Sequence, residues 1–109
     1  MRRKGVVDQR VTLGRITVEL GAERVLDASG RPCALRPQTF AVLRHLIANP
    51  GRLVTKDELM QAVWPGVAVT DDSLVQCVGE IRRLLGDAGK TLVETVPRRG
   101  YRSAPTPGR

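Results

Sequence analysis

Aromatic residues are scarce in this chain of 109 residues, which holds one Phe, one Trp and one Tyr. With so little aromatic volume, a hydrophobic core has to be built mainly from Leu, Val, Ile and Ala. A chain of this length can bury a modest core of that kind as one domain, without support from a metal ion or a disulfide. The sequence therefore predicts a single domain with an aliphatic core.

Residues that build metal and catalytic sites are also few. The chain has two cysteines, Cys33 and Cys77, and neither has another Cys or the single His near it at metal-ligand spacing. Both cysteines lie in apolar patterns, which indicates small buried hydrophobic residues. His45 is accompanied by no nucleophile or carboxylate in the sequence pattern, so we expect an exposed helical residue without a role.

The sequence contains no phosphate-cradling glycine loop and no acid–base pair. These absences argue against an enzyme, and we expect no cofactor and no small-molecule substrate. No apolar run is long enough to span a bilayer, and the start of the chain lacks the apolar segment of a signal peptide. We therefore expect a cytoplasmic protein.

Positive charge, by contrast, is abundant and concentrated at the two ends. The chain carries 18 Lys and Arg residues against 11 Asp and Glu residues, a net charge of +7. Residues 1–10 contain four basic residues and one acidic residue, and residues 90–109 contain five and one, which leaves nine of each sign between them. Such terminal charge predicts binding to a polyanion, with solubilising basic tails as the alternative.

The stretch from Thr70 to Gly86 has the pattern of one amphipathic helix. Apolar residues recur at three- and four-residue steps and so share one face: Leu74, Cys77, Val78, Ile81 and Leu85. The opposite face is mixed and carries Asp72, Gln76, Gly79 and Arg83, flanked by Val75, Glu80 and Arg82. Glycine within a helix costs about 1 kcal/mol relative to alanine. Gly79 therefore indicates either the close approach of another surface or a tolerated glycine on an ordinary surface helix.

The N-terminal third of the chain predicts a small antiparallel sheet. Ile16, Val18 and Leu20 alternate with polar residues, which is the period of a strand with one buried face. A second strand is expected near residues 24–26 and a third near residues 31–35, because the turn between them is rich in Asp, Ser and Gly.

Two helices follow the predicted sheet. Pro37 suits the first position of a helix that ends before an Asn-Pro-Gly turn. Thr55 then has the position of an N-cap, with Glu58 at the spacing of a capping box, and the helix that it opens runs to Trp64. A Pro-Gly pair ends this helix, and a short loop leads to the amphipathic helix at 70–86, which Thr70 or Asp71 can cap.

A hairpin is predicted after the third helix. Residues 92–96 form its first strand, residues 97–100 form a turn with two adjacent arginines, and residues 101–102 begin the returning strand. The order is therefore sheet, three helices and hairpin, an α+β arrangement. Two helices joined by a short turn and followed by an arginine-tipped hairpin predict a winged helix-turn-helix.

The predicted domain spans residues 15–102. Residues 1–14 are interpreted as a basic N-terminal tail, and residues 103–109 as a Pro-rich tail or linker.

Four motifs in this order resemble one known family. They are NPGRLVTKDEL, the VW pair that ends the second helix, SLVQCVGEIRRLLGD and the terminal RRGYR. Their order and spacing are similar to those of OmpR/PhoB-type winged-helix DNA-binding domains, and the closest resemblance is to the CadC/ToxR-like branch of transcriptional regulators. The resemblance covers residues 15–102, which is the whole of the predicted domain.

This resemblance implies a sequence-specific regulator that binds double-stranded DNA, with residues 70–86 in the major groove and the wing, residues 95–102, in the minor groove. The positions that match base or groove contacts in the family are Asp72, Val75, Gln76, Gly79, Arg82, Arg83, Arg98 and Arg99. The positions that match phosphate contacts are Lys56, Trp64, Ser73, Thr95, Tyr101 and Arg102. The chain departs from the family pattern at Gly79 and Glu80, where bulkier or basic residues are common. It also departs in the wing, where the arginine commonly precedes the glycine turn but here Pro97 leads Arg98 and Arg99.

The resemblance also implies two further partners: RNA polymerase, through the loop at residues 65–70, and a second copy arranged head to tail on DNA. Plainer interpretations stand beside the DNA contacts. Trp64 suits a core residue, Arg82 and Arg83 suit surface charges at a helix C-terminus, and Glu80 suits an intrahelical pair with Arg83. The alternative function is a winged helix that serves as a protein-interaction module without sequence-specific DNA binding.

Overall fold

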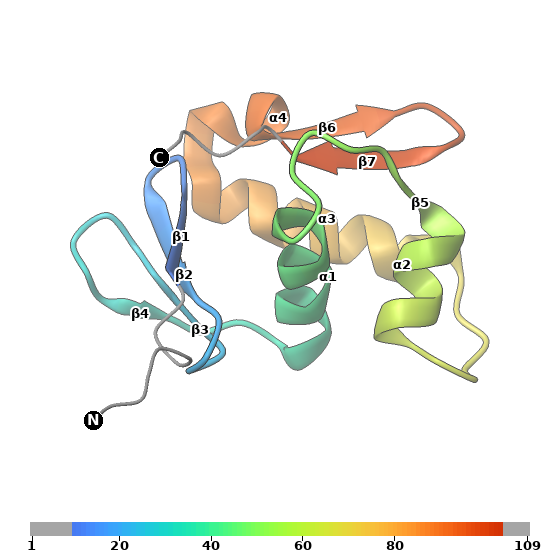
Figure 1. The fold of residues 1–109 in the computed structure, drawn as a ribbon, viewed down its shortest axis with the longest axis horizontal. Helices are drawn as coiled ribbons and strands as arrows, with labels where there is room; N and C mark the ends of the chain where they lie inside the picture. The colour runs from blue at the N-terminus through green and yellow to red at the C-terminus, as the bar shows by residue number, and fades with distance from the viewer. Residues whose placement is uncertain (1–9, 104–109) are drawn as a thin grey trace.

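The computed structural model describes residues 10–103 (Figure 1). The first part of the chain forms β1 (Arg10–Leu13), β2 (Ile16–Glu19), β3 (Arg24–Leu26), β4 (Pro32–Cys33), α1 (Pro37–Ile47) and β5 (Val54–Thr55). The second part forms α2 (Lys56–Val63), α3 (Asp71–Leu85), the 3₁₀ turn η1 (Gly86–Ala88), α4 (Gly89–Leu92), β6 (Val93–Val96) and β7 (Gly100–Ser103). This order confirms the predicted α+β winged helix-turn-helix.

The N-terminal sheet is antiparallel in the order β1-β2-β3-β4. Its first strand lies inside the stretch interpreted as a basic tail, and it pairs with β2 from Arg10 opposite Glu19 to Leu13 opposite Ile16. In β1 an Arg and a Thr alternate with a Val and a buried Leu, a strand pattern that the surrounding basic residues obscure. The sheet therefore begins at Arg10, earlier than the predicted domain start at residue 15.

A charged ladder on the outer face of this sheet joins three of its strands. Glu19 is only 7% exposed, although it is acidic. The Arg10 Nη2 lies 3.0 Å from the Glu19 Oε2. The Arg24 Nη2 and Nε lie 2.6 and 2.7 Å from the Glu19 Oε1. Both arginines stand directly opposite Glu19 on neighbouring strands, where opposite charges stabilise the pairing. Arg10, counted above with the terminal charge, thus has an internal partner.

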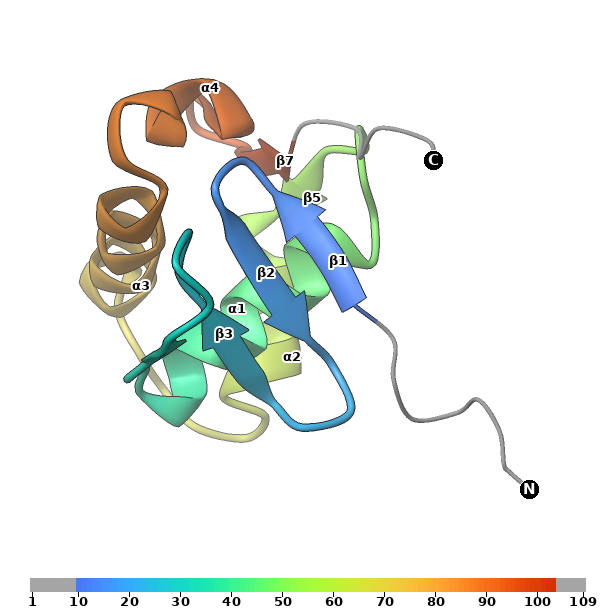
Figure 2. The ribbon, with the colours of Figure 1, turned by 90° about the vertical axis from the view of Figure 1, so that its left-hand side faces the viewer.

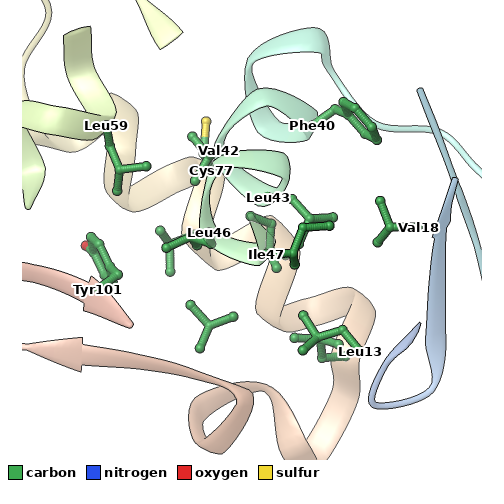
Figure 3. Packing of buried hydrophobic residues seen from close by; sticks show 14 of the residues in the cluster. Leu13, Val18, Phe40, Val42, Leu43, Leu46, Ile47, Leu59, Cys77 and Tyr101 are labelled. Carbon is green, nitrogen blue, oxygen red and sulfur yellow. The ribbon is translucent and has the colours of Figure 1, made fainter. Parts of the chain in front are cut away.

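α1 occupies the middle of the domain, with the N-terminal sheet on one side, α2 on the other and α3 beside it (Figures 1 and 2). Its side chains Phe40, Leu43 and Leu46 are buried. Figure 3 shows residues of α1 meeting Leu13 and Val18 from the sheet, Leu59 from α2 and Tyr101 from β7. Most of this core is Leu, Val and Ile, as the composition predicts. The elements that surround α1 are therefore positioned through contact with one central helix.

The start of α2 confirms the predicted cap and corrects the expectation for His45. The Thr55 hydroxyl accepts a hydrogen bond from the Glu58 backbone N–H at 3.1 Å. The Glu58 carboxylate itself binds other partners, because its Oε2 lies 2.7 Å from both the His45 Nε2 and an Nη2 of Arg52. His45 is half-buried and links α1 to α2, so the prediction that it has no role is wrong. Its partner lies on another helix, beyond the reach of a local pattern.

The C-terminal sheet has the order β5-β7-β6, so the hairpin is joined to the domain through β5. Gly100 stands opposite Thr55, and a Cβ at this glycine would collide with the Val54 carbonyl oxygen. Between α3 and β6 the chain forms η1 and α4. A Cβ at Gly89 would lie 2.7 Å from the Arg82 carbonyl oxygen, so glycine allows α4 to approach α3 closely.

We expect Glu58→Gln to weaken the dependence of stability on acid pH. Hydrogen bonds from Arg52 and then His45 lower the pKa of Glu58 to about 2, from an ordinary value of 4.5. A lowered pKa stabilises the fold above pH 4.5, and this contribution is lost as the pH falls toward 2. Denaturant unfolding of the variant should therefore show a smaller loss of unfolding free energy across this range.

Glu94→Gln is the matched control, because it removes a carboxylate from an exposed ion pair on the hairpin. An unchanged pH profile in Glu58→Gln would contradict the prediction.

Candidate nucleic-acid interface

The side of α3 opposite the core forms one exposed stripe. Leu74, Cys77, Val78, Ile81 and Leu85 are all buried, which confirms the predicted apolar face. Asp72, Val75, Gln76 and Arg83 are exposed on the other side. Val75 stands out because 54% of its surface is accessible, although a valine gains by burial. We call Asp72, Val75, Gln76, Gly79 and Arg83 the exposed stripe of α3.

Gly79 has no internal reason to be glycine. A Cβ built on it meets nothing within 4 Å apart from the helix's own neighbouring backbone. Alanine would therefore fit in the free domain and would favour the helix by about 1 kcal/mol. No contact within residues 10–103 explains a glycine here, so the close approach of another molecule to α3 is the remaining physical reason.

Glu80 belongs to the protein's interior contacts rather than to the exposed stripe. Its Oε1 accepts a hydrogen bond from the Thr39 hydroxyl at 2.6 Å, and its Oε2 lies 2.6 Å from an Nη2 of Arg36. The Thr39 hydrogen bond, followed by Arg36, lowers the pKa of Glu80. The first turn of α1 has no acidic residue, so Glu80 supplies negative charge where the helix dipole favours it. Its main partners are therefore on α1, and Arg83 contributes only a weaker charge interaction.

Arg82 is placed differently from the expectation that it contacts a base. Its Nε and Nη2 donate to the Val93 carbonyl oxygen at 3.0 and 2.6 Å, and the same Nη2 donates to the Thr95 hydroxyl at 2.7 Å. The side chain is half-buried between α3 and β6, while its neighbour Arg83 is exposed. Arg82 therefore joins the last turn of α3 to the hairpin.

The tip of the hairpin carries two exposed arginines on a strained turn. The Arg99 N–H donates to the Val96 carbonyl oxygen at 3.0 Å, which closes a turn with Pro97 at its second position. Arg98 occupies the third position with φ of +67°, as in a type II turn, where glycine is usual. A non-glycine residue there costs roughly 1–2 kcal/mol. Strain of this kind concentrates at functional sites, which points to a use for the Arg98 side chain.

The two faces of the hairpin separate the residues that match phosphate contacts in the family. Thr95 stands opposite Tyr101, and Glu94 stands opposite Arg102, so alternation places these pairs on opposite faces. Tyr101 is 5% exposed and belongs to the core. The Nε and Nη2 of Arg102 bind one oxygen of Glu94 at 3.0 and 2.7 Å. Arg102 therefore lies on the face turned away from Thr95. The resemblance to the family, which groups both residues as phosphate contacts, did not indicate this separation.

The other predicted phosphate contacts lie around the turn between α2 and α3. The Lys56 Nζ is 3.1 Å from the Asp71 Oδ2, and the Lys56 backbone N–H donates to the Arg99 carbonyl oxygen at 3.0 Å. Trp64 is half-buried at the end of α2 and packs against the core. Ser73 is half-buried in the first turn of α3. Their contacts with phosphate stay predictions.

Two arginines that the sequence did not single out flank Arg83. Arg83 lines two shallow depressions beside α3, one shared with Arg36 and the other with Arg15. Arg15 also donates from its Nε to the Leu84 carbonyl oxygen at 3.0 Å. These residues come from distant parts of the sequence, so no local motif could have revealed that basic side chains gather at this end of α3.

Within residues 10–103, no group of three or more His, Cys, Asp or Glu side chains is placed to hold a metal ion. Among the helices of that same range, none combines the length and the apolar character needed to cross a membrane.

The sheet, the helix-turn-helix of α2 and α3 and the arginine-tipped hairpin define a winged helix-turn-helix DNA-binding domain. The chain belongs to the family described as "Transcriptional regulatory protein, C terminal", whose model matches residues 30–103. This is a family of transcriptional regulators and not of enzymes.

Named relatives are similar to this chain over part of their length. The chain is 30% identical over 80 residues to the transcriptional activator CadC of Escherichia coli K12, a match that covers 71% of this chain and 16% of CadC. It is 36% identical over 67 residues to the transcriptional regulator HilA of Salmonella typhi, covering 61% of this chain and 12% of HilA. The chain thus spans less than a fifth of either relative.

Solved structures share the fold over most of this chain. The DNA-binding domain of E. coli CadC has a TM-score of 0.72 at 27% identity, covering 90% of this chain and 94% of that one. The DNA-binding domain of Klebsiella pneumoniae RstA, in complex with the RstA box, has a TM-score of 0.71 at 25% identity, covering 89% and 98%.

We expect Arg98→Gly to make the domain more stable and its binding to DNA weaker. Glycine adopts the left-handed conformation without the cost of roughly 1–2 kcal/mol that arginine has there. The greater backbone entropy of glycine in the unfolded chain offsets part of this stabilisation. The lost charge lowers affinity for duplexes of any sequence and reduces the salt dependence. Thermal unfolding and salt titration of duplex binding measure the two effects.

Arg98→Lys is the control, since it keeps both the charge and the strain. A glycine variant that is less stable than the parent would contradict the strain at Arg98, and one that binds DNA equally tightly would show that the arginine has no use in binding.

Proposed function

We propose that this domain binds double-stranded DNA sequence-specifically as part of a transcriptional regulator. In this proposal α3 lies in the major groove, with residues 70–86 as the recognition helix, and the wing at residues 95–102 reaches the adjacent minor groove. The observation that carries the proposal is the exposed stripe of α3, which has an accessible Val75 and a missing Cβ at Gly79, beside a hairpin that presents Arg98 and Arg99.

The side chains of the exposed stripe suit the edges of bases. Glutamine can pair bidentately with adenine and arginine with guanine, each worth about 1–3 kcal/mol of discrimination against the wrong base. Gln76 and Arg83 have these capacities, and Val75 offers an apolar contact for a thymine methyl group. Gly79 lies one turn after Val75 and Gln76, where a missing side chain allows the DNA to come closer to the helix backbone.

In this proposal the charges that attract DNA lie outside the helix that contacts the bases. Residues 70–86 carry three acidic residues and two basic residues, so this helix by itself does not attract DNA. Glu80, Arg82 and Asp71 are engaged with other elements, which leaves Asp72 and Arg83 as the charges of the exposed stripe. Attraction then comes from the wing arginines and from Arg15 beside the end of α3, through contacts with phosphates.

The proposal extends to two protein partners. RNA polymerase is proposed to contact the loop at residues 65–70, and support comes from Val67, which is 59% exposed although apolar. A second copy is proposed to pair head to tail on tandem DNA sites, as the family resemblance implies.

Selection of bound duplexes from random sequence, followed by salt titration on the selected site, tests the proposal. Recovery of a defined motif, bound well above random duplexes, is the expected result. If the domain instead binds every duplex like a generic basic protein, sequence-specific binding fails and a protein-interaction role becomes the better account.

Arg83→Ala should weaken binding to the selected site more than binding to random duplexes, because the arginine lies on the exposed stripe. Discrimination at one base pair should fall by roughly tenfold, corresponding to the loss of one bidentate contact. Competition binding with single-base variants of the site measures this change. Equal losses on both kinds of duplex would instead place Arg83 on phosphate.

Gly79→Ala should raise stability and lower specific affinity at the same time. The added methyl group meets open space in the free domain and improves helix propensity by about 1 kcal/mol. Against DNA the same methyl group occupies the space that the glycine leaves for close approach. Thermal unfolding and binding to the selected site report the two effects separately.

Gln61→Ala, at an exposed position of α2, controls for a general effect of adding alanine to a helix. If Gly79→Ala is more stable and also binds as tightly as the parent, Gly79 is an ordinary tolerated glycine.

A further inference from the structure

β6 is the edge strand of the C-terminal sheet, because the order is β5-β7-β6. An edge strand presents backbone groups that no neighbouring strand can pair. Here Arg82 takes the place of a neighbour. Its guanidinium donates twice to the Val93 carbonyl oxygen and once to the hydroxyl of Thr95, two residues further along the strand. One side chain of α3 therefore hydrogen-bonds to the outer edge of the hairpin.

The hairpin has its other attachments on the opposite side. β5 pairs with β7, where Val54 stands opposite Tyr101, and the Lys56 N–H donates to the Arg99 carbonyl oxygen at 3.0 Å. Those contacts hold the hairpin to the start of α2. Arg82 ties it directly to α3 through its own hydrogen bonds, and Arg82 immediately precedes Arg83 of the exposed stripe.

We propose that Arg82 is a positioning residue that sets the wing at a fixed spacing from the recognition helix, so that both engage DNA together. This proposal rests on the proposed function above. Arginine suits the task because its planar fork reaches two acceptors with three hydrogen bonds, while lysine supplies a single ammonium group. Contacts made by Arg83 and by the wing tip at Arg98 then reinforce each other, since neither element moves freely relative to the other.

Arg82 also orients Thr95. A hydroxyl group has one donor and two acceptor positions, and the Thr95 oxygen accepts from Arg82. Its own hydrogen is thereby left to donate outward from an exposed position of the wing. A phosphate oxygen is an acceptor of the kind that such a hydrogen needs. Thr95 can thus serve the phosphate contact that the family match assigns to it, with Arg82 acting through it and not on a base.

A double-mutant cycle between Arg82 and Arg98 tests the proposal on the selected duplex, at a temperature where every variant is folded. Arg82→Met keeps the length of the side chain and removes its donors. We expect Arg98→Ala to weaken binding about tenfold in the parent and less than about threefold in Arg82→Met, a coupling in the range found for interacting groups. Base preference at the α3 positions should stay unchanged in Arg82→Met.

Three results would overturn the proposal. Losses that multiply independently would show that Arg82 does not act through the wing. A changed base preference in Arg82→Met would make Arg82 a base reader. Arg82→Lys keeps the charge, so full recovery of affinity and of coupling in that variant would attribute the effect to charge alone and overturn the positioning role. If Arg82→Met does not fold, Arg82→Lys carries the same cycle and should show reduced coupling.

Amide hydrogen exchange on the free domain separates this proposal from the proposed function. Arg82→Met should speed exchange at Val93–Val96 while α1 keeps the protection of the parent. Unchanged exchange in β6, or faster exchange throughout the domain, would reject the anchor. If the parent domain selects no DNA motif, the proposed function fails, and faster exchange confined to β6 would still show that Arg82 holds the wing.

Discussion

The packing of α3 on α1 is the contact on which the rest of the domain depends. Five apolar residues of α3 are buried on one face, and α1 is the element with which α3 makes its main contact. The same central helix receives Glu80 at its first turn and holds the hairpin through the Ser103 hydroxyl, which donates to the Leu46 carbonyl oxygen at 2.9 Å. Because α3 and the hairpin both contact α1, the recognition helix and the wing share one reference element.

The residues of α3 outside its buried face fall into two groups according to their angle on the helix. Those at the borders of the buried face bind other elements: Asp71 reaches α2, Glu80 reaches α1 and Arg82 reaches β6. Those furthest from the core, centred on Val75, Gln76 and Gly79, are left without such contacts in residues 10–103. A single helix thereby holds the domain together with one set of side chains and leaves another set exposed. In the wing, Arg98 has a positive φ, which lowers the stability of the domain, while its exposed side chain is available to a partner.

Local patterns predicted the elements well. The period of 3.6 located α1 and α3, and turn residues located β3 and the tip of the hairpin, because these signals arise between residues close in sequence. Predictions failed where a long-range contact decides. β1 forms because β2 lies beside it, and His45 gains a role because Glu58 comes from another helix. Tyr101 is likewise placed in the core by a contact distant in sequence, because β7 packs over α1, while its contact with phosphate stays a prediction.

The sequence by itself determined which residues form helices and strands, which face of each is apolar, and that net positive charge lies toward the ends of the chain. Only the tertiary structure decided which charged side chains bind partners within the domain, as Arg82 and Glu80 do, and which stay exposed, as Arg83 does. It also decided that Arg15 and Arg36 flank Arg83. The physical reason is reach: a long polar side chain binds whatever acceptor packing brings within about 3 Å, and that neighbour is set by the fold.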